Sequence, residues 1–193
     1  MRPVVISIVV TLLFAAPSLA VKAQNNERSD LKKIEQSLQA DVPRVLCLSK
    51  GLTTGGQPSD HAFSKLASNG FRSVLNLRTA SEGIDLEKQR AAVEEAGMRY
   101  LHIPVAGRAP QADQVEAFIR LVKDESNHPM FIHCGTASRV GAFMMIYRMV
   151  EHGWKEGKAL DEAVRIGLRS EELKKFARDY IERRSTMAPP PSR

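Results

Sequence analysis

The chain has 193 residues, of which 43% are hydrophobic and 26% are charged, a composition typical of one soluble globular domain and too short for two ordinary ones. The formal net charge of +6 is spread along the chain and forms no dense basic run, so we expect no nucleic-acid partner. A diffuse positive charge either favours anionic substrates or serves solubility alone.

The first 23 residues have the pattern of a cleavable secretory signal peptide. Arg2 supplies a positive charge, residues 4–16 are mostly apolar, and small residues precede two candidate cleavage points, after Ala20 and after Ala23. The apolar run is shorter than the ~20 residues that span a bilayer, so we expect cleavage rather than anchoring. The mature protein is therefore predicted to be periplasmic or secreted, without stable membrane insertion.

The remaining chain alternates between strand and helix patterns. Residues 24–42 are polar with a weak helical pattern, which predicts a peripheral helix or a linker, and residues 43–185 form the domain. In chain order we expect a strand at 44–48, a glycine-rich connection at 51–59, a helix at 60–69, a strand at 72–77, a helix at 84–96, a strand at 98–105, a helix at 111–125, a strand at 129–133, and helices at 139–152, 155–167 and 170–184. Residues 186–193 are a Pro-rich tail that we expect to be disordered. This order predicts an α/β domain with a mostly parallel central sheet flanked by helices.

A short loop after the apolar strand at 129–133 carries the strongest chemical signal. The loop residues between Cys134 and Arg139 are all small, and they are Gly135, Thr136, Ala137 and Ser138. Small residues let the backbone curl around a tetrahedral anion, and unpaired N–H groups at the start of the following helix attract it. We therefore expect all four, together with Arg139, to bind phosphate.

The two residues that flank the loop have the properties of a catalytic pair. The field at a helix N-terminus favours the thiolate of Cys134, which makes it a nucleophile. Arg139 offers a planar fork that matches two phosphate oxygens. Ser138 or Thr136 is placed to donate a hydrogen bond to the thiolate, and His133 is expected to orient the loop through backbone contacts rather than act as a base. This chemistry requires no metal and no cofactor.

The loop HCGTASRVG at 133–141 is similar to the active-site loop of cysteine phosphatases. Together with GQPS at 56–59, VLNLR at 74–78 and YLHIPV at 100–105, it resembles the bacterial dual-specificity-phosphatase-like domains, which include the beta-lactamase-hydrolase-associated phosphatase domain. The resemblance covers roughly residues 44–153. It implies a three-layer phosphatase-like fold, a phosphorylated small molecule or phosphoprotein as substrate, Cys134 as nucleophile and Arg139 as phosphate binder.

Two departures keep other functions open. Four residues separate Cys134 from Arg139, whereas tyrosine and dual-specificity phosphatases have five, and short loops also occur in rhodanese-like sulfurtransferases. The segment 106–110, where phosphatases carry an aspartate general acid, has no carboxylate. Asp113 is the nearest, and the first turn of a helix explains it as well. A sulfurtransferase and a weakly active phosphate-binding module are therefore the alternatives.

Several residues outside the loop are weaker candidates. Arg78, at a strand end, is placed either over the same sheet edge as Cys134 or on the surface. Gln57 and Arg108 either line the pocket mouth or face solvent. Cys47 lies in an apolar run and is expected in the core, unless it lies close enough to Cys134 to resolve its oxidation as a disulfide.

Overall fold

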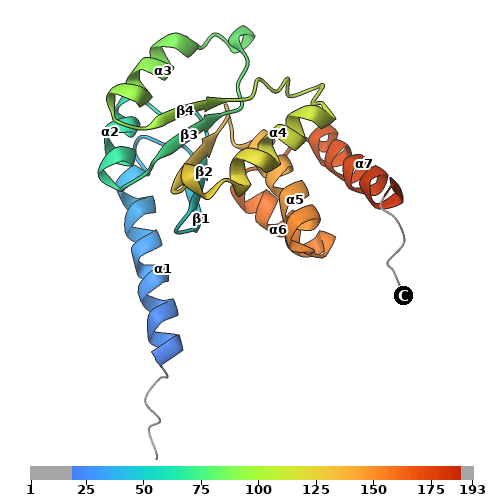
Figure 1. Ribbon diagram of the computed structural model, residues 1–193, viewed down its shortest axis with the longest axis horizontal. Helices are drawn as coiled ribbons and strands as arrows, with labels where there is room; N and C mark the ends of the chain where they lie inside the picture. Colours follow the sequence, from blue (N-terminus) through green and yellow to red (C-terminus); the bar gives the residue numbers. More distant parts are fainter. Residues whose placement is uncertain (1–18, 188–193) are drawn as a thin grey trace, which may run out of the picture.

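The computed structural model describes residues 19–187, which fold around one five-stranded sheet (Figure 1). The strands are β1 (Leu46–Ser49), β2 (Leu52–Gly55), β3 (Ser73–Asn76), β4 (Arg99–His102) and β5 (Met130–His133). Their order across the sheet is β1-β2-β5-β3-β4. Only the β1–β2 pair is antiparallel. Strand β5, which leads into the predicted loop, therefore lies at the centre of the sheet.

Helices cover both faces of this sheet. On one side lie α1 (Leu19–Leu38), α2 (Asp60–Ser68) and α3 (Leu86–Glu95), and on the other lie α4 (Ala112–Lys123), α5 (Ser138–His152), α6 (Glu156–Ile166) and α7 (Glu171–Met187). Two short 3-10 turns, η1 (Ala80–Glu82) and η2 (Glu125–Asn127), follow β3 and precede β5. The sheet therefore lies between two layers of helices, α1 to α3 on one face and α4 to α7 on the other.

The alternation of side chains along the strands explains the two cores. In β5, Phe131 packs with buried residues of α1, α2 and α3, whereas Met130 and Ile132 pack with α4 to α7. The same division separates Val74 from Leu75 in β3. Successive residues of a strand point to opposite faces, so an apolar strand buries both of its faces under helices. The predicted three-layer α/β fold with a mostly parallel sheet is confirmed.

The prediction that 51–59 is only a connection is wrong at its start. Leu52–Gly55 form β2, which pairs antiparallel with β1 and parallel with β5. Two of its four residues are threonines, and all four are buried. The β-branched threonines favour a strand, and Lys50-Gly51 is the two-residue turn of a hairpin. The neighbouring glycines concealed this signal.

The predicted signal peptide and the predicted C-terminal tail lie only partly within the described residues. The predicted signal peptide 1–23 lies outside them as far as residue 18, and both candidate cleavage points fall within α1. Residues 24–38 of the predicted linker are helical, and of the predicted tail only 186 and 187 are described, as the end of α7. Between residues 19 and 187, no helix is both long and apolar enough to cross a membrane.

Candidate active site

The predicted loop lies where the carboxyl ends of the central strands meet. It joins β5 to α5, and the segments that follow β3 and β4 run beside it. The backbone N–H of Leu77 donates to the carbonyl of His133 at 2.9 Å, and that of Val105 donates to Leu77 at 3.2 Å. Three consecutive parallel strands of the sheet therefore bring their C-terminal segments together around Cys134, as expected for ligand sites in open α/β sheets.

The loop is compact, and its back is held by the segment after β2. Cys134 is only 1% exposed. The backbone N–H of Gln57 donates to the carbonyl of Gly135 at 3.1 Å. A Cβ atom on Gly56 would lie 3.1 Å from that same carbonyl oxygen, so the close approach favours glycine there. Ala137 adopts a left-handed conformation with φ 66 and turns the chain into α5.

Arg139, in the first turn of α5, is nearly buried and is held on one side by four acceptor oxygens. Its Nη1 donates to the carbonyls of Leu77 at 3.1 Å and Val105 at 2.7 Å and to Oε1 of Glu82 at 2.6 Å, and its Nη2 donates to the second Glu82 oxygen at 2.6 Å. Its Nε–H and one Nη2–H donate to no oxygen of the described residues, and the Cys134 side chain lies close enough to the guanidinium to help raise the pKa of Arg139. That edge of the guanidinium has the planar geometry that matches two oxygens of a phosphate.

Glu82 in η1 is the site residue that sequence reasoning missed. Burial by itself would raise the pKa of Glu82, but hydrogen bonds from Arg139 and the Thr79 backbone, together with the charge of Arg139, lower it to about 2. Glu82 is therefore ionised at neutral pH. For its partner the signs are reversed: burial would lower the pKa of Arg139, but Glu82 raises it above its ordinary value.

Arg78 and Gln57 form a second layer behind this pair. Arg78 donates from Nε to Glu82 at 3.1 Å and from Nη1 to the side-chain oxygen of Gln57 at 2.9 Å. Gln57 holds the loop through its backbone. Neither residue lines the pocket above the loop. Arg78 thus lies at the predicted sheet edge, but it contacts Glu82 rather than the space where an anion would bind.

His133 is completely buried at the end of β5. Its ring stacks on Phe131 with 5.7 Å between centroids, and neither ring nitrogen has a hydrogen-bond partner among the described residues. Burial lowers the pKa of His133 to about 3, so the ring is neutral at physiological pH. The carbonyl of His133 accepts from the backbone N–H of Leu77, a backbone contact of the kind expected, and the expectation that the ring does not act as a base fits its burial.

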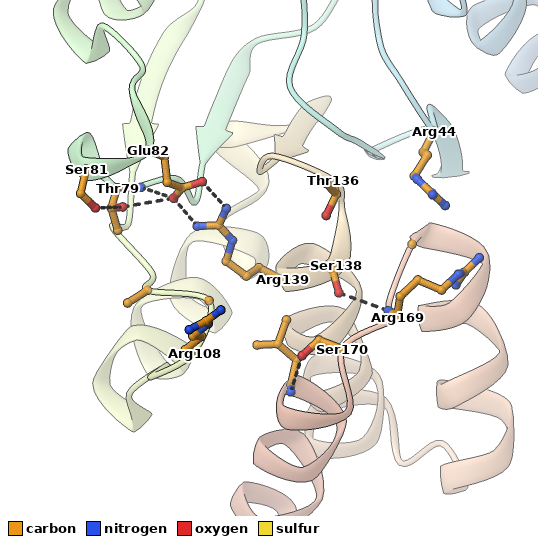
Figure 2. A pocket seen from close by; sticks show the side chains of 14 residues that line it. Arg44, Thr79, Ser81, Glu82, Arg108, Thr136, Ser138, Arg139, Arg169 and Ser170 are labelled. Atoms are coloured by element: carbon orange, nitrogen blue, oxygen red, sulfur yellow. Dashed lines mark hydrogen bonds and ion pairs between the residues drawn. The ribbon is translucent and has the colours of Figure 1, made fainter.

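A pocket of about 610 Å³ opens over the loop (Figure 2). Thr136, Ser138 and Arg139 of the loop line it, whereas Gly135 and Ala137 do not, and Cys134 lies buried beneath. Ser138 accepts a hydrogen bond from the backbone N–H of Arg169 at 3.2 Å. The remaining lining residues are Arg44, Thr79, Ser81, Glu82, Ala106, Gly107, Arg108, Gly167, Arg169, Ser170 and Leu173.

Comparison with known proteins identifies the family. Residues 29–185 match the family described as a DSP-PTPase phosphatase fused to NAD+ kinase, which is more than half of the chain. The chain belongs to this phosphatase family. The predicted dual-specificity and tyrosine phosphatase resemblance is confirmed, and the family favours phosphatase chemistry over the sulfurtransferase alternative.

Individual relatives agree with this assignment. The beta-lactamase hydrolase-like protein of Xylella fastidiosa is 30% identical over 113 residues, which are 56% of this chain and 25% of that protein. The dual specificity protein phosphatase TpbA of Pseudomonas aeruginosa is 30% identical over 97 residues, 49% of this chain and 44% of TpbA. The chain therefore spans about a quarter of the first relative and less than half of the second.

Solved structures show the same fold. A protein of Shewanella putrefaciens CN-32 described as a candidate phosphatase is 21% identical, with a TM-score of 0.65 over 77% of this chain and 97% of that one. A structure of TpbA in complex with phosphotyrosine is 22% identical, with a TM-score of 0.61 over 76% and 91% of the two chains.

The segment that carries the general acid in many phosphatases has no carboxylate here. Ala106, Gly107 and Arg108 line the pocket. Asp113 is exposed in the first turn of α4, where its side chain accepts from the backbone N–H of Gln114 at 2.9 Å. Among the described residues that line the pocket, Glu82 is the only carboxylate. It is ionised, and it accepts hydrogen bonds from Arg78 and Arg139. Nor do the described residues gather three or more His, Cys, Asp or Glu side chains to hold a metal ion.

The suggestion that Cys47 resolves an oxidised Cys134 is wrong. Cys47 faces Thr53 across the β1–β2 pair, and Thr53 faces Phe131 in β5. Cys134 lies three residues beyond Phe131, so two strand spacings and three residue rises separate the cysteines by roughly 14 Å, twice the reach of a disulfide. Cys47 is buried and accepts a hydrogen bond from the Thr53 hydroxyl at 3.2 Å, which agrees with the predicted core role.

Proposed function

We propose that the protein hydrolyses phosphomonoesters through a cysteinyl-phosphate on Cys134. The thiolate attacks phosphorus, the bond from phosphorus to the ester oxygen breaks, and the leaving group departs with the electron pair and takes a proton from water. A water molecule then attacks the phosphocysteine and loses a proton to solvent, the sulfur–phosphorus bond breaks with its electron pair returning to the Cys134 thiolate, and inorganic phosphate leaves. Loop N–H groups and Arg139 stabilise the charge on the phosphoryl oxygens in both steps.

The observation that carries this proposal is the way Arg139 is held. Its Nη1 and one Nη2–H are bound by Glu82 and two backbone carbonyls, which leaves Nε–H and one Nη2–H directed elsewhere. An arginine fixed on one edge costs little further ordering when its free edge binds an anion. This preorganised fork stands at the start of α5, one residue after the loop.

The acid-free segment determines which esters react well. Without a protonated group near the leaving oxygen, a poor leaving group loses the ~100–10,000-fold that general acid catalysis supplies. Aryl phosphates, whose phenolate leaves without protonation, lose least. The phosphotyrosine bound in the TpbA structure supports an aryl phosphate as a reactive class.

Hydrolysis of p-nitrophenyl phosphate tests this function directly. We expect turnover that Cys134→Ser abolishes. We also expect a cysteinyl-phosphate on Cys134 that mass spectrometry detects after rapid acid quenching. An alkyl phosphate such as glycerol phosphate should react at least 100-fold more slowly than the aryl ester. Hydrolysis by Cys134→Ser at the rate of the unaltered protein would contradict the mechanism.

A phosphate-binding module with little or no turnover is the second candidate, and the lack of a pocket acid favours it. It predicts that tungstate or phosphate binds in an Arg139-dependent manner while no ester is hydrolysed. Calorimetry of phosphate binding with Arg139→Lys, run beside the turnover assay, separates the two functions. A lysine keeps the charge but not the planar fork.

We also propose that the protein acts in the periplasm or outside the cell after cleavage of residues 1–20 or 1–23. The pattern of Arg2, an apolar stretch and small residues before each cleavage point supports this. N-terminal sequencing of protein recovered from the periplasmic fraction tests it, and a mature chain that retains Met1 would contradict it.

A further inference from the structure

The pocket above the loop contains more positive charge than a single phosphate requires. Four arginines line it, and they are Arg44, Arg108, Arg139 and Arg169, against one carboxylate, Glu82. Glu82 is already bound by Arg139 and by Arg78 behind it. Within residues 19–187, Arg44, Arg108 and Arg169 form no ion pair with any carboxylate, whereas many surface arginines and lysines of this protein do.

Arg44 is fixed next to the loop by the backbone. It has a left-handed conformation with φ 56, uncommon for a residue with a side chain. The carbonyl of the preceding Pro43 accepts from the N–H of Gly56 at 2.7 Å, and the next N–H, of Gln57, donates to Gly135 of the loop. Two consecutive residues thus tie Arg44 and the anion loop together. Such conformations persist where the surroundings impose them, often at ligand sites.

Arg169 is fixed to the other side of the same loop. Its backbone N–H donates to Ser138, and its Nη1 donates to the carbonyls of Val164 at 2.7 Å and Leu168 at 2.8 Å. These carbonyls hold one part of the guanidinium, and its remaining N–H groups have no acceptor among the described residues. Figure 2 shows Arg44 and Arg169 on the same side of the pocket, with Thr136 and Ser138 between them and Arg139.

Arg108 lies apart from this pair. In Figure 2 it is on the opposite side of the loop, below Glu82. The charge of Arg108 contributes to the lowered pKa of Glu172, after the hydrogen bond from Ser170, so part of the field of Arg108 is offset. The uncompensated positive charge beside the loop is therefore concentrated at Arg44 and Arg169.

We propose that Arg44 and Arg169 form a second anion subsite, so that the substrate of this phosphatase is a small molecule with at least two phosphoryl groups. One phosphoryl group enters the loop, and the other contacts Arg44 and Arg169. The described lining of the pocket contains no aromatic side chain, so a phosphotyrosine ring finds nothing to stack on, whereas a second phosphate finds two guanidinium groups. This inference rests on the proposed function only in that the loop holds the reacting phosphate.

Binding measured without turnover separates this inference from the phosphatase proposal. The Cys134→Ser chain is titrated in a calorimeter with inorganic phosphate, which fills the loop alone, with fructose 1,6-bisphosphate, which carries two esters, and with tripolyphosphate, a phosphate anhydride. We expect both larger anions to bind at least tenfold more tightly than phosphate. Whichever of the two binds more tightly identifies whether the second group is attached as an ester or as an anhydride.

Substitutions locate the extra affinity. In the Cys134→Ser background, Arg44→Gln and Arg169→Gln should each reduce the preference for the larger anions over phosphate by about five- to twentyfold. Arg120→Gln is the matched control, because it removes the same charge from an exposed arginine of α4 that does not line the pocket. It should leave the preference within about twofold.

Three results would overturn the subsite. The first is equal affinity for phosphate and both larger anions. The second is an unchanged preference after Arg44→Gln and Arg169→Gln, or an equal loss after Arg120→Gln. The third is a phosphotyrosyl peptide that binds more tightly than both larger anions, which would favour a protein substrate. Failure of p-nitrophenyl phosphate turnover, in contrast, overturns the phosphatase proposal and leaves these affinities interpretable.

Discussion

At the scale of single residues, the geometry of the site depends on one carboxylate that pairs with two arginines. Glu82 binds both terminal nitrogens of Arg139 and a nitrogen of Arg78. Its ionised form determines which edge of Arg139 remains free, because the guanidinium plane is fixed by two parallel hydrogen bonds. Glu82 is therefore a positioning residue for Arg139, the arginine proposed to bind phosphate.

Glu82→Gln should lower kcat/KM for p-nitrophenyl phosphate by about 10–100-fold, because Arg139 loses its charged partner and is no longer held in one orientation. Phosphate affinity should fall with it. Glu87→Gln is the control, since Glu87 is an exposed carboxylate of α3 that also pairs with an arginine, Arg90 at 3.4 Å. Steady-state kinetics test the pair, and equal effects from both substitutions would contradict the positioning role.

His133 gives the protein a pH-dependent stability with a definite sign. Its pKa falls from 6.5 to about 3 in the folded chain, so between these values the unfolded chain binds a proton that the folded chain does not. The free energy of unfolding should therefore decrease as pH falls below 6.5, by up to about 1.4 kcal/mol per pH unit from this residue. Glu82, whose pKa falls from 4.5 to about 2, contributes stability above 4.5 that is lost only as the pH drops below it.

His133→Asn isolates this contribution. Urea unfolding at pH 7.5, 6.0 and 5.0 should give a shallower pH dependence for His133→Asn than for the unaltered protein, because the two proteins differ at this residue alone. The window from 6.5 down to 4.5 avoids the contribution of Glu82. Parallel pH profiles for the two proteins would contradict the burial of a neutral ring.

At the scale of elements, the sequence predicted what depends on local pattern and missed what depends on partners across the sheet. The apolar strand 129–133, the small-residue loop and the helix after it were all predicted, because each carries its own periodicity. β2 was missed because Gly51 and Gly55 flank two threonines whose burial comes from β1 and β5. Glu82 was missed because its partner Arg139 is 57 residues away, and its only local signal is a capping box with Thr79.

The contact between α5 and α6 holds the helix that carries Arg139. At Gly141 of α5, a Cβ atom would lie 2.7 Å from the carbonyl oxygen of Ala163 and 3.1 Å from the backbone nitrogen of Leu168. Both are backbone atoms, so the two elements cannot keep this separation if a methyl group is added. Glycine is needed here for close approach rather than for its dihedral freedom.

Gly141→Ala should destabilise the protein by roughly 1–3 kcal/mol, because overpacking outweighs the better helix propensity of alanine. Gly157→Ala in α6 is the matched control: nothing lies within 4 Å of the position of its Cβ, so it should stabilise by up to ~1 kcal/mol. Urea unfolding measures both. A stabilising Gly141→Ala would contradict the prediction, because it would show that α6 moves away from α5 without loss of stability.

At the scale of the whole molecule, α1 extends away from the three layers (Figure 1). The side chains of residues 23–26 are exposed, whereas Leu38 is completely buried in the core cluster that also contains Val42, Phe63 and Phe131, and Ile34 packs against that cluster. The last turns of α1 thus belong to the core, and its first described side chains do not. Cleavage after Ala20 or Ala23, as proposed for export, would remove none of the described side chains that pack on the domain.

Shortened chains test this division of α1. A chain that begins at Asp30 should keep its free energy of unfolding within about 0.5 kcal/mol of the full chain, as expected for exposed positions. A chain that begins at Asp41 loses Leu38 and Ile34 and should be less stable by at least 2–5 kcal/mol, the usual cost of removing one buried leucine side chain. The rate of p-nitrophenyl phosphate hydrolysis by the first chain should match that of the full chain, because α1 does not line the pocket above the loop. If the first deletion destabilises the protein as much as the second, the exposed first turns of α1 must contact the domain in solution, which would contradict this division of the helix.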